Sequence, residues 1–306
     1  MQTILGSGGA IGTPLAKELS AFTGTIRLVS RNPKKVNDSD ELFPADITDP
    51  KQVDKAVEGS EVVYLTVGLA YDHRVWRKEW PNLMRNVLES CRKYNSRLVF
   101  FDNVYALDMD FMYNITEETP IKPVSRKGEV RAEIDRMILD EMDGGKLQVI
   151  IARCADFYAV KNSVLVEMVY KNLLKNKKAM WFADATKIHT FTAATDAARG
   201  VAMLGNTPDS YNQVWNLPTD RTPLTGHQWI GLFARLMHKE SRMMVIPVWM
   251  LTITGMFVPV FREFKEMIYQ YDRDYIFNSS KFEKRFNYTP LKPEEGIARL
   301  IVELGP

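Results

Sequence analysis

The sequence predicts an α/β fold, with a doubly wound parallel sheet in the first half and a smaller C-terminal portion. Three observations favour this class. Short apolar runs rich in β-branched residues alternate with longer helical patterns, an arrangement that forms parallel sheets through helical crossovers. A glycine-rich segment stands between the first apolar run and the first helix. After about residue 158 the alternation ends and the pattern becomes irregular.

Six strands and four helices are expected in the first 158 residues. The strands are expected at Gln2–Leu5, Thr25–Val29, Glu41–Pro44, Val62–Val67, Arg97–Phe101 and Leu147–Ala152. The helices are expected at Pro14–Ser20, Lys51–Val57 and Trp80–Tyr94, and from about Lys127 to Met142. Apolar residues in the third helix recur at helical spacing, so that helix presents an apolar face to the sheet.

The remaining chain is expected to form a portion that covers the substrate. We expect residues 1–158 to form the sheet domain and residues 159–306 to be mainly substrate-binding, with 188–217 returning to the sheet. The patterns predict a helix at Val164–Lys175 and a strand at Val214–Leu217.

The uncharged stretch Met243–Phe261 is long enough to raise the question of a membrane span. Pro247, Gly255 and Pro259 interrupt it, which favours a short buried helix between two proline breaks. An apolar patch at a membrane interface is the nearer alternative. We therefore expect no membrane span.

Composition and motif content argue against several classes of function. Forty Lys and Arg against 38 Asp and Glu give a net charge of +2 with no basic stretch, so no nucleic-acid partner is expected. Cys91 and Cys154 lie far apart, which indicates free, buried thiols in a reducing, cytoplasmic setting. The N-terminus has no secretory pattern. The four histidines are dispersed and no GxSxG motif occurs, so neither a metal site nor a hydrolase is expected.

The glycine loop predicts a dinucleotide site. Gly6, Gly9 and Gly12 stand between the first strand and a helix, the context that a Rossmann phosphate-binding loop requires. These glycines permit the tight turn, the backbone's approach to a pyrophosphate, and close strand–helix packing, while the helix N-terminus supplies free N–H groups. The cofactor-binding candidates here are Gly6, Ser7, Gly9, Ala10, Ile11 and Gly12.

Arg31 indicates which dinucleotide binds. It stands nineteen residues after Gly12, where an NAD-selective site carries Asp or Glu for the ribose hydroxyls. A guanidinium can pair with a 2′-phosphate, and Ser30 can add a hydroxyl donor, so NADP(H) is favoured and NAD is the alternative. Lys34 and Lys35 add positive charge nearby.

Further candidates follow the later strands. Asp46 can accept a hydrogen bond from the adenine amine or cap the next helix, although Thr48 and Asp49 are better placed to cap it. The carboxyl ends of parallel strands bind ligands in open α/β sheets. The remaining cofactor-binding candidates on this ground are Ile47, Gly68, Asp102 and Asn103.

The motifs ILGSGGAIG, SRNP, ADITDP, EVVYLTVG and VFFDNVY together resemble the cofactor side of the extended short-chain dehydrogenase/reductase superfamily, the NAD-dependent epimerase/dehydratase family. The similarity continues through ARCADFY, HTFTAATDAARG and VWNLP, and so covers most of the chain. The resemblance implies a Rossmann fold, a nicotinamide cofactor and an oxidoreductase or epimerase acting on a small molecule.

The chain departs from that superfamily at its catalytic pair. Members carry Tyr and Lys four residues apart, and aligning the segment PVSRKGEVRAEID places Lys127 and Arg131 at these positions. Arg131 can still hold the ribose, although it donates no proton at neutral pH. Lys127 either acts as acid or base, through a pKa lowered by burial and by Arg131, or is a solvated helix-start lysine. Tyr105 is the second candidate acid and Tyr158 a third. The replacement of the usual Tyr and Lys resembles an atypical subgroup of the superfamily.

Two functions stay open on the sequence. The first is an NADP(H)-dependent oxidoreductase or epimerase/dehydratase-like enzyme acting on a carbonyl or hydroxyl substrate. The second is a non-catalytic NADP(H)-binding sensor that keeps the glycine loop and has lost the Tyr and Lys. The substrate, the reaction direction and the oligomeric state, with a homodimer among the options, are left open.

Overall fold

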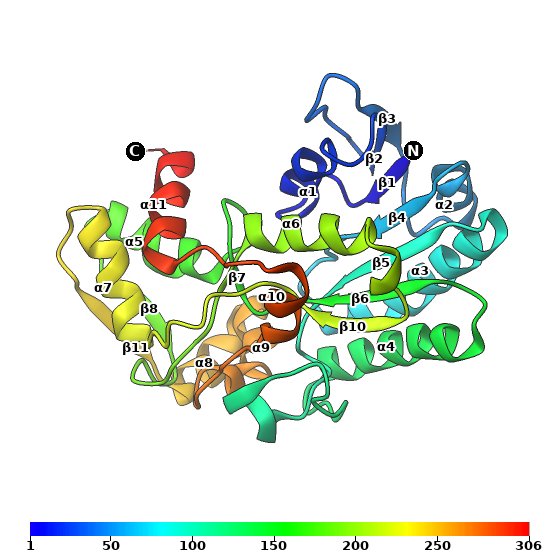
Figure 1. Ribbon diagram of the computed structural model, residues 1–306. Coiled ribbons are helices and arrows are strands. Elements are labelled where there is room, and N and C mark those ends of the chain that lie inside the picture. The colour runs from blue at the N-terminus through cyan, green and yellow to red at the C-terminus, as the bar shows by residue number, and fades with distance from the viewer. Residues whose placement is uncertain (306) are drawn as a thin grey trace. The chain divides into compact units, whose positions relative to one another are not determined.

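The computed structural model describes residues 1–305, apart from the side chains of residues 259 and 260, and contains a seven-stranded sheet (Figure 1). The strand order is β10-β6-β5-β4-β1-β2-β3, and each neighbouring pair is parallel. The strands are β1 (Gln2–Leu5), β2 (Ile26–Ser30), β3 (Glu41–Pro44), β4 (Val62–Leu65), β5 (Arg97–Asp102), β6 (Val149–Arg153) and β10 (Gln213–Asn216). The predicted α/β Rossmann fold is confirmed.

Helices cover both faces of this sheet. They are α1 (Gly12–Leu19), α2 (Pro50–Val57), α3 (His73–Tyr94), α4 (Arg126–Gly144) and α6 (Ala194–Gly205), with a 3-10 turn η3 (Pro208–Ser210). Helix α1 packs against α6 on one face, while α2 and α3 pack together on the other with α4 beside them (Figure 1). Because both faces are covered, all the side chains of β1, β4 and β6 are buried.

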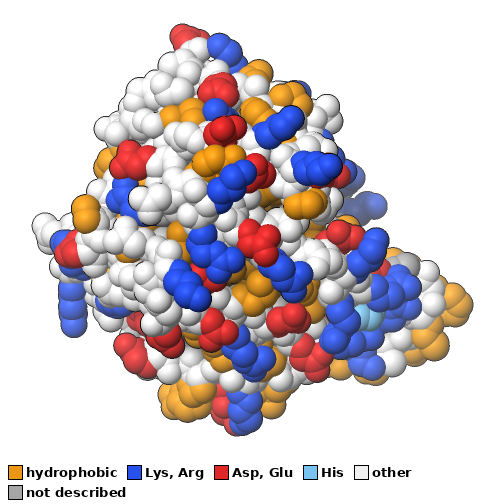
Figure 2. Space-filling view, turned by 90° about the vertical axis from the view of Figure 1, so that its right-hand side faces the viewer, with side chains coloured by type: hydrophobic (Ala, Val, Ile, Leu, Met, Phe, Trp, Pro, Cys, Tyr) orange, Lys and Arg blue, Asp and Glu red, His pale blue; other side chains and the backbone are white. Residues whose placement is uncertain are grey.

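The outer surface of this helical layer carries charges of both signs. Figure 2 shows Lys and Arg side chains interspersed with Asp and Glu on the side that carries α2 and α3. Lys93 Nζ lies 2.7 Å from an Asp54 oxygen, and Arg92 Nη1 lies 2.6 Å from Glu141 Oε1. Opposite charges therefore offset one another locally on this face.

The chain divides into two units. The first comprises Met1–Ala106, Lys127–Cys154 and Ala194–Leu217, and the second Leu107–Arg126, Ala155–Ala193 and Pro218–Pro306. The expected division had placed the boundary after residue 158 and the return at 188–217. The second unit instead also includes Leu107–Arg126, and its next segment begins at Ala155, where the short strands β7 (Phe157–Tyr158) and β9 (Thr192–Ala193) pair with each other.

The second unit has its own apolar core. Its other strands are β8 (Ala179–Phe182) and β11 (Met243–Ile246), which pair in parallel. Its α-helices are α5 (Lys171–Leu174), α7 (Gly226–Leu236), α8 (Val248–Phe257), α9 (Pro259–Lys265), α10 (Ser280–Phe286) and α11 (Pro293–Leu304). Short turns occur at η1 (Met109–Asn114), η2 (Leu165–Tyr170) and η4 (Ile268–Gln270), η2 being π-helical. Buried aromatic side chains such as Trp181, Trp229 and Phe233 dominate this core.

Two expectations about helices are wrong. Helix α3 begins at His73 rather than Trp80, because Asp72 caps it and Pro81 is accommodated inside the helix. Helix α8 is not buried between its proline breaks, since several of its large apolar side chains are exposed. Among the described residues, no helix has both the length and the apolar character needed to cross a bilayer.

Candidate functional site

The glycine loop between β1 and α1 requires glycine at two positions. Gly6 has a φ of +102°, and a Cβ added there would lie 2.7 Å from the backbone N of Val67. A Cβ on Gly12 would lie 2.4 Å from the carbonyl O of Gly6, too close for any real contact. Gly9 has more space, with its nearest neighbour at 3.4 Å, and Gly8 has no described heavy atom within 4 Å. The close approach of strand and helix therefore depends on Gly6 and Gly12.

Polar groups without partners gather at this loop. In the described part of the chain, the N–H groups of Ala10, Ile11 and Gly12 make no backbone hydrogen bond. Ile11 occupies the N-cap of α1 and offers no side-chain acceptor. The Ser7 hydroxyl is buried and has no hydrogen-bond partner among the described residues. A phosphate group would satisfy these donors, so the loop fits a dinucleotide pyrophosphate.

The ends of β2 and β3 carry the residues expected to meet the ribose and adenine. Ser30 ends β2, and Arg31 follows it with an exposed side chain. The Asp46 carboxylate accepts hydrogen bonds from Thr48 N at 3.0 Å and Thr48 Oγ1 at 2.8 Å. These bonds, helped by the charge of Arg31, hold the pKa of Asp46 below its ordinary value. Ile47 is buried beside them.

The ends of β4 and β5 hold three more of the predicted residues. Gly68 is exposed, and a Cβ there would meet no described atom within 4 Å, so the backbone does not require glycine. Asn103 is half-buried, and its Oδ1 accepts a hydrogen bond from the amide of Tyr105 at 2.9 Å. Asp102 is buried, and neither carboxylate oxygen makes a hydrogen bond to a described residue.

Lys127 is completely buried at the start of α4, which rules out the solvated lysine considered above. Its Nζ lies 4.4 Å from the centre of the Tyr71 ring, a cation–π distance. Tyr71 meets Trp76 edge-on at 6.1 Å, and Trp76 stacks on Tyr105 with 15° between the ring planes. The two candidate proton donors, Lys127 and Tyr105, therefore adjoin one group of aromatic rings.

Arg131 lies one helical turn further along α4 and is enclosed by aromatic rings. Its guanidinium carbon lies 4.3 Å from the ring centre of Trp80, 5.1 Å from that of Trp76 and 5.3 Å from that of Phe100. Its Nη1 lies 3.5 Å from Asp102 Oδ1. Burial lowers the pKa of Arg131, but a guanidinium starts so high that it stays charged. Arg131 therefore supplies a fixed positive charge.

Two further residues complete a buried cluster of charges. Arg153 Nε lies 3.8 Å from Asp102 Oδ2, and Arg153 Nη2 donates to Asp135 Oδ2 at 3.3 Å. Burial, and next the Asp102 carboxylate, raise the pKa of Asp135 well above its ordinary value. Asp135 was not among the residues expected at the site. Its position four residues after Arg131 on the same helix was the available signal.

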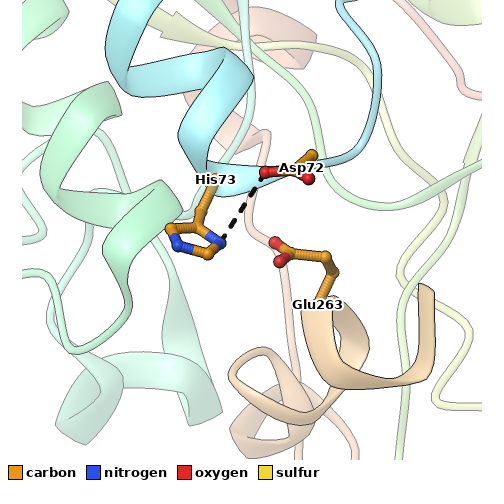
Figure 3. A group of neighbouring side chains, drawn as sticks. All are labelled: Asp72, His73 and Glu263. Atoms are coloured by element: carbon orange, nitrogen blue, oxygen red, sulfur yellow. Dashed lines mark ion pairs between the residues drawn. The ribbon is translucent and has the colours of Figure 1, made fainter. Parts of the chain in front are cut away.

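The start of α3 fixes the aromatic residues that enclose Lys127 and Arg131. The Asp72 side chain accepts a hydrogen bond from the amide of Arg74 at 2.8 Å, which caps the helix. Hydrogen bonds from Arg74 lower the pKa of Asp72. The Nδ1 atom of His73 lies 3.9 Å from Asp72 Oδ1 (Figure 3). Trp76 and Trp80 therefore both lie in the first turns of a capped helix.

A separate polar group lies within the second unit. His189 is 1% exposed, and its Nε2 lies 3.1 Å from Asp156 Oδ2. Tyr271 donates a hydrogen bond to the same oxygen at 3.0 Å. The His189 ring stacks on Tyr271 at 4.4 Å and on Tyr275 at 4.5 Å. This environment is that of a hydrogen-bonded structural histidine.

Comparison with known proteins agrees with this geometry. The family model described as NAD dependent epimerase/dehydratase family matches residues 3–217, which is more than half of the chain. No curated protein sequence matches the chain significantly.

Solved structures match nearly the whole chain at low identity. A dTDP-glucose 4,6-dehydratase from Bacillus anthracis, in complex with NAD, has a TM-score of 0.80 and 17% identity, covering 99% of this chain and 95% of that one. The UDP-glucose 4-epimerase of Thermus thermophilus, also with NAD, has a TM-score of 0.77 and 16% identity, covering 99% and 98%. At such identities the likeness shows the fold alone.

Proposed function

The chain belongs to the NAD-dependent epimerase/dehydratase family, and from this premise we propose an NADP(H)-binding enzyme that acts on a carbonyl or hydroxyl group of a small molecule. The observation that carries the proposal is the glycine loop. Its backbone requires glycine at positions 6 and 12. The N–H groups at the start of α1 and the Ser7 hydroxyl are hydrogen-bond donors that an anion could satisfy. A dinucleotide pyrophosphate has the charge and the acceptors to fill this place.

The preference for NADP(H) over NAD(H) rests on Arg31. Its exposed guanidinium follows the last residue of β2, with Lys34 and Lys35 also exposed close by in sequence. A 2′-phosphate would gain a bidentate partner there, and Ser30 could donate a further hydrogen bond. The NAD found in solved relatives favours NAD instead. A direct comparison of the two cofactors therefore decides between them.

The proton-transfer step is assigned to Lys127 or Tyr105. A bound nicotinamide would supply hydride transfer at its C4. Lys127 carries an ammonium that can donate a proton, held against the Tyr71 ring, and Tyr105 carries a phenol in a half-buried position. Arg131 is proposed to hold the ribose through its fixed positive charge, because its guanidinium is buried among aromatic rings.

Single substitutions test this assignment. Purified protein is screened with carbonyl compounds while NADPH consumption is followed by absorbance. Lys127→Met, which keeps the volume of a buried side chain, and Tyr105→Phe are then compared for turnover and for NADPH affinity. We expect at least one variant to lose turnover by about a hundredfold or more with unchanged NADPH affinity. Unchanged turnover in both variants would remove both residues from the mechanism.

A non-catalytic sensor is the second candidate function. The observation that favours it is the replacement of the superfamily's Tyr and Lys by Lys127 and Arg131, both of which are buried beside aromatic rings. Tight NADPH binding without consumption of NADPH by any carbonyl compound would establish this alternative.

The proposed setting is a reducing cytoplasm. Cys91 and Cys154 are both buried and neither forms a disulfide, which supports it. A homodimer stays part of the proposal until the oligomeric state is measured.

A further inference from the structure

Helix α8 presents an apolar stripe to the outside. Trp249 is 61% exposed, Ile253 49%, Met256 70% and Phe257 80%. Their spacing of four, three and one residues places them on one side of the helix. We call these four residues the α8 stripe. Large apolar side chains exposed together on a soluble protein mark an interaction surface.

The opposite side of α8 is already occupied. Leu251 is fully buried in the core of the second unit. Helix α9 lies beside α8 (Figure 1), and a Cβ on Gly255 would lie 3.0 Å from Cα of Arg262. Gly255 therefore allows the two helices to pack closely. The α8 stripe is the outer face of a helix that is fixed from behind.

Exposed cations occur in the chain next to α8. Before the helix, Arg242 is exposed but forms an ion pair with the exposed Glu240. After the helix, Arg262 and Lys265 are exposed, whereas Glu263 is 1% exposed. Exposed cations near an anionic lipid surface favour binding. The apolar stripe is therefore followed along the chain by two exposed cations.

We propose that the α8 stripe docks on the surface of an anionic lipid membrane, with α8 lying in the interface. Tryptophan and phenylalanine favour this depth of the bilayer, and basic residues favour anionic headgroups. The ten residues of α8 extend about 15 Å, half the thickness of a hydrocarbon core. The helix therefore rests on the membrane and does not span it. This inference is independent of the proposed enzymatic function.

A second copy of the chain is the competing occupant. The four side chains expose about 500 Å² in all if each offers about 200 Å² when fully exposed. A stable protein–protein interface buries about 800 Å² on each partner. The stripe is smaller than this, and a symmetric partner would bring a second pair of exposed cations, Arg262 and Lys265, to the same interface. Area and charge both favour a lipid surface.

Tryptophan fluorescence can report on the stripe alone. The chain has six tryptophans. Five are at most 5% exposed, namely Trp76, Trp80, Trp181, Trp215 and Trp229. Trp249 is therefore the one that a brominated lipid can quench on contact, and Trp249→Phe should abolish the quenching while retaining the binding.

The experiment uses the full chain with vesicles of phosphatidylcholine, with and without phosphatidylglycerol. We expect sedimentation with the phosphatidylglycerol vesicles, weaker sedimentation at high salt, and quenching of Trp249 by brominated lipid. Met256→Ser combined with Phe257→Ser should weaken the partition by about tenfold or more. Val302→Ser, at a residue 82% exposed on α11, is the matched control and should change nothing.

Three results would overturn the proposal. They are no sedimentation of the wild type, binding that survives the double substitution unchanged, and quenching that persists in Trp249→Phe. A concentration-dependent dimer that the double substitution disrupts, without vesicle binding, would assign the stripe to a second copy instead. Circular dichroism of the double variant must match the wild type, which separates lost docking from lost folding.

Discussion

Replacing Gly12 by alanine should displace the loop that is proposed to hold the pyrophosphate. The added Cβ would lie 2.4 Å from the carbonyl O of Gly6 and 2.8 Å from Cα of Ser7. The first distance is about 1 Å shorter than an ordinary contact. Both neighbours are backbone atoms, which cannot rotate away as a side chain would. The loop or the start of α1 must therefore move by about this amount.

The expected effect on binding follows from the lost hydrogen bonds. A bond from an amide to a charged group contributes about 1.5–3 kcal/mol. Loss of one such bond raises the Kd for NADPH and for NADH by roughly tenfold to a hundredfold. The same overlap should lower the free energy of unfolding by about 1–3 kcal/mol. Fluorescence titration and urea unfolding of the same preparation measure the two quantities.

Gly8→Ala is the matched control, because its Cβ would meet no described atom within 4 Å. We expect its affinity for both cofactors to stay within about twofold of the wild type. If Gly12→Ala folds cooperatively and binds NADPH as tightly as Gly8→Ala, the loop does not hold the pyrophosphate and the reasoning fails.

Three further predictions concern specificity and stability. Arg31→Asp should weaken NADPH binding more than NADH binding in fluorescence titrations, and an equal loss for both would remove the basis for NADP preference. The raised pKa of Asp135 means that the folded state binds its proton more tightly, so this residue's contribution to stability falls as pH rises above about 4. Urea unfolding measures the free energy of unfolding of the wild type and of Asp135→Asn across this pH range. We expect this free energy to fall less steeply with rising pH in the variant than in the wild type. Parallel curves for the two proteins would contradict the raised pKa. Asp49→Ala should cost about 1 kcal/mol in the same assay, since Asp49 caps α2 through the amide of Lys51, and no loss would mean that water replaces the cap.

The sheet could be predicted because its signals are local. Apolar runs such as Val62–Leu65 and Val149–Arg153 are short, rich in β-branched residues and separated by helical patterns. The glycine loop identified the first crossover directly. Strand ends shifted by one or two residues, for example from Thr25–Val29 to Ile26–Ser30, because pairing with a neighbouring strand decides where a strand stops.

Tertiary contacts determine the start of α3 and the exposure of α8, which the sequence did not predict. The helix was expected to start at Trp80, yet the cap at Asp72 and the packing of Trp76 extend α3 back to His73, with Pro81 inside it. Helix α8 has the composition of a core helix, but only its Leu251 side reaches the core. The pattern of apolar residues alone could not distinguish a buried helix from one that lies on a surface.

The candidate site shows the same division. Lys127, Arg131 and Asp102 were identified from their places along the chain, but their burial and ring contacts depend on residues far away in sequence. The pairing of Asp102 with Arg153 follows from the register of β5 with β6, which no local pattern specifies. The places of these residues along the chain could be predicted from the sequence. Their burial and their neighbouring rings and charges could not.

Calorimetric titration of the purified protein with NADPH and with NADH is the most direct measurement. The account predicts saturable binding of one dinucleotide per chain, with NADPH the tighter. The absence of saturable binding for both cofactors would contradict it.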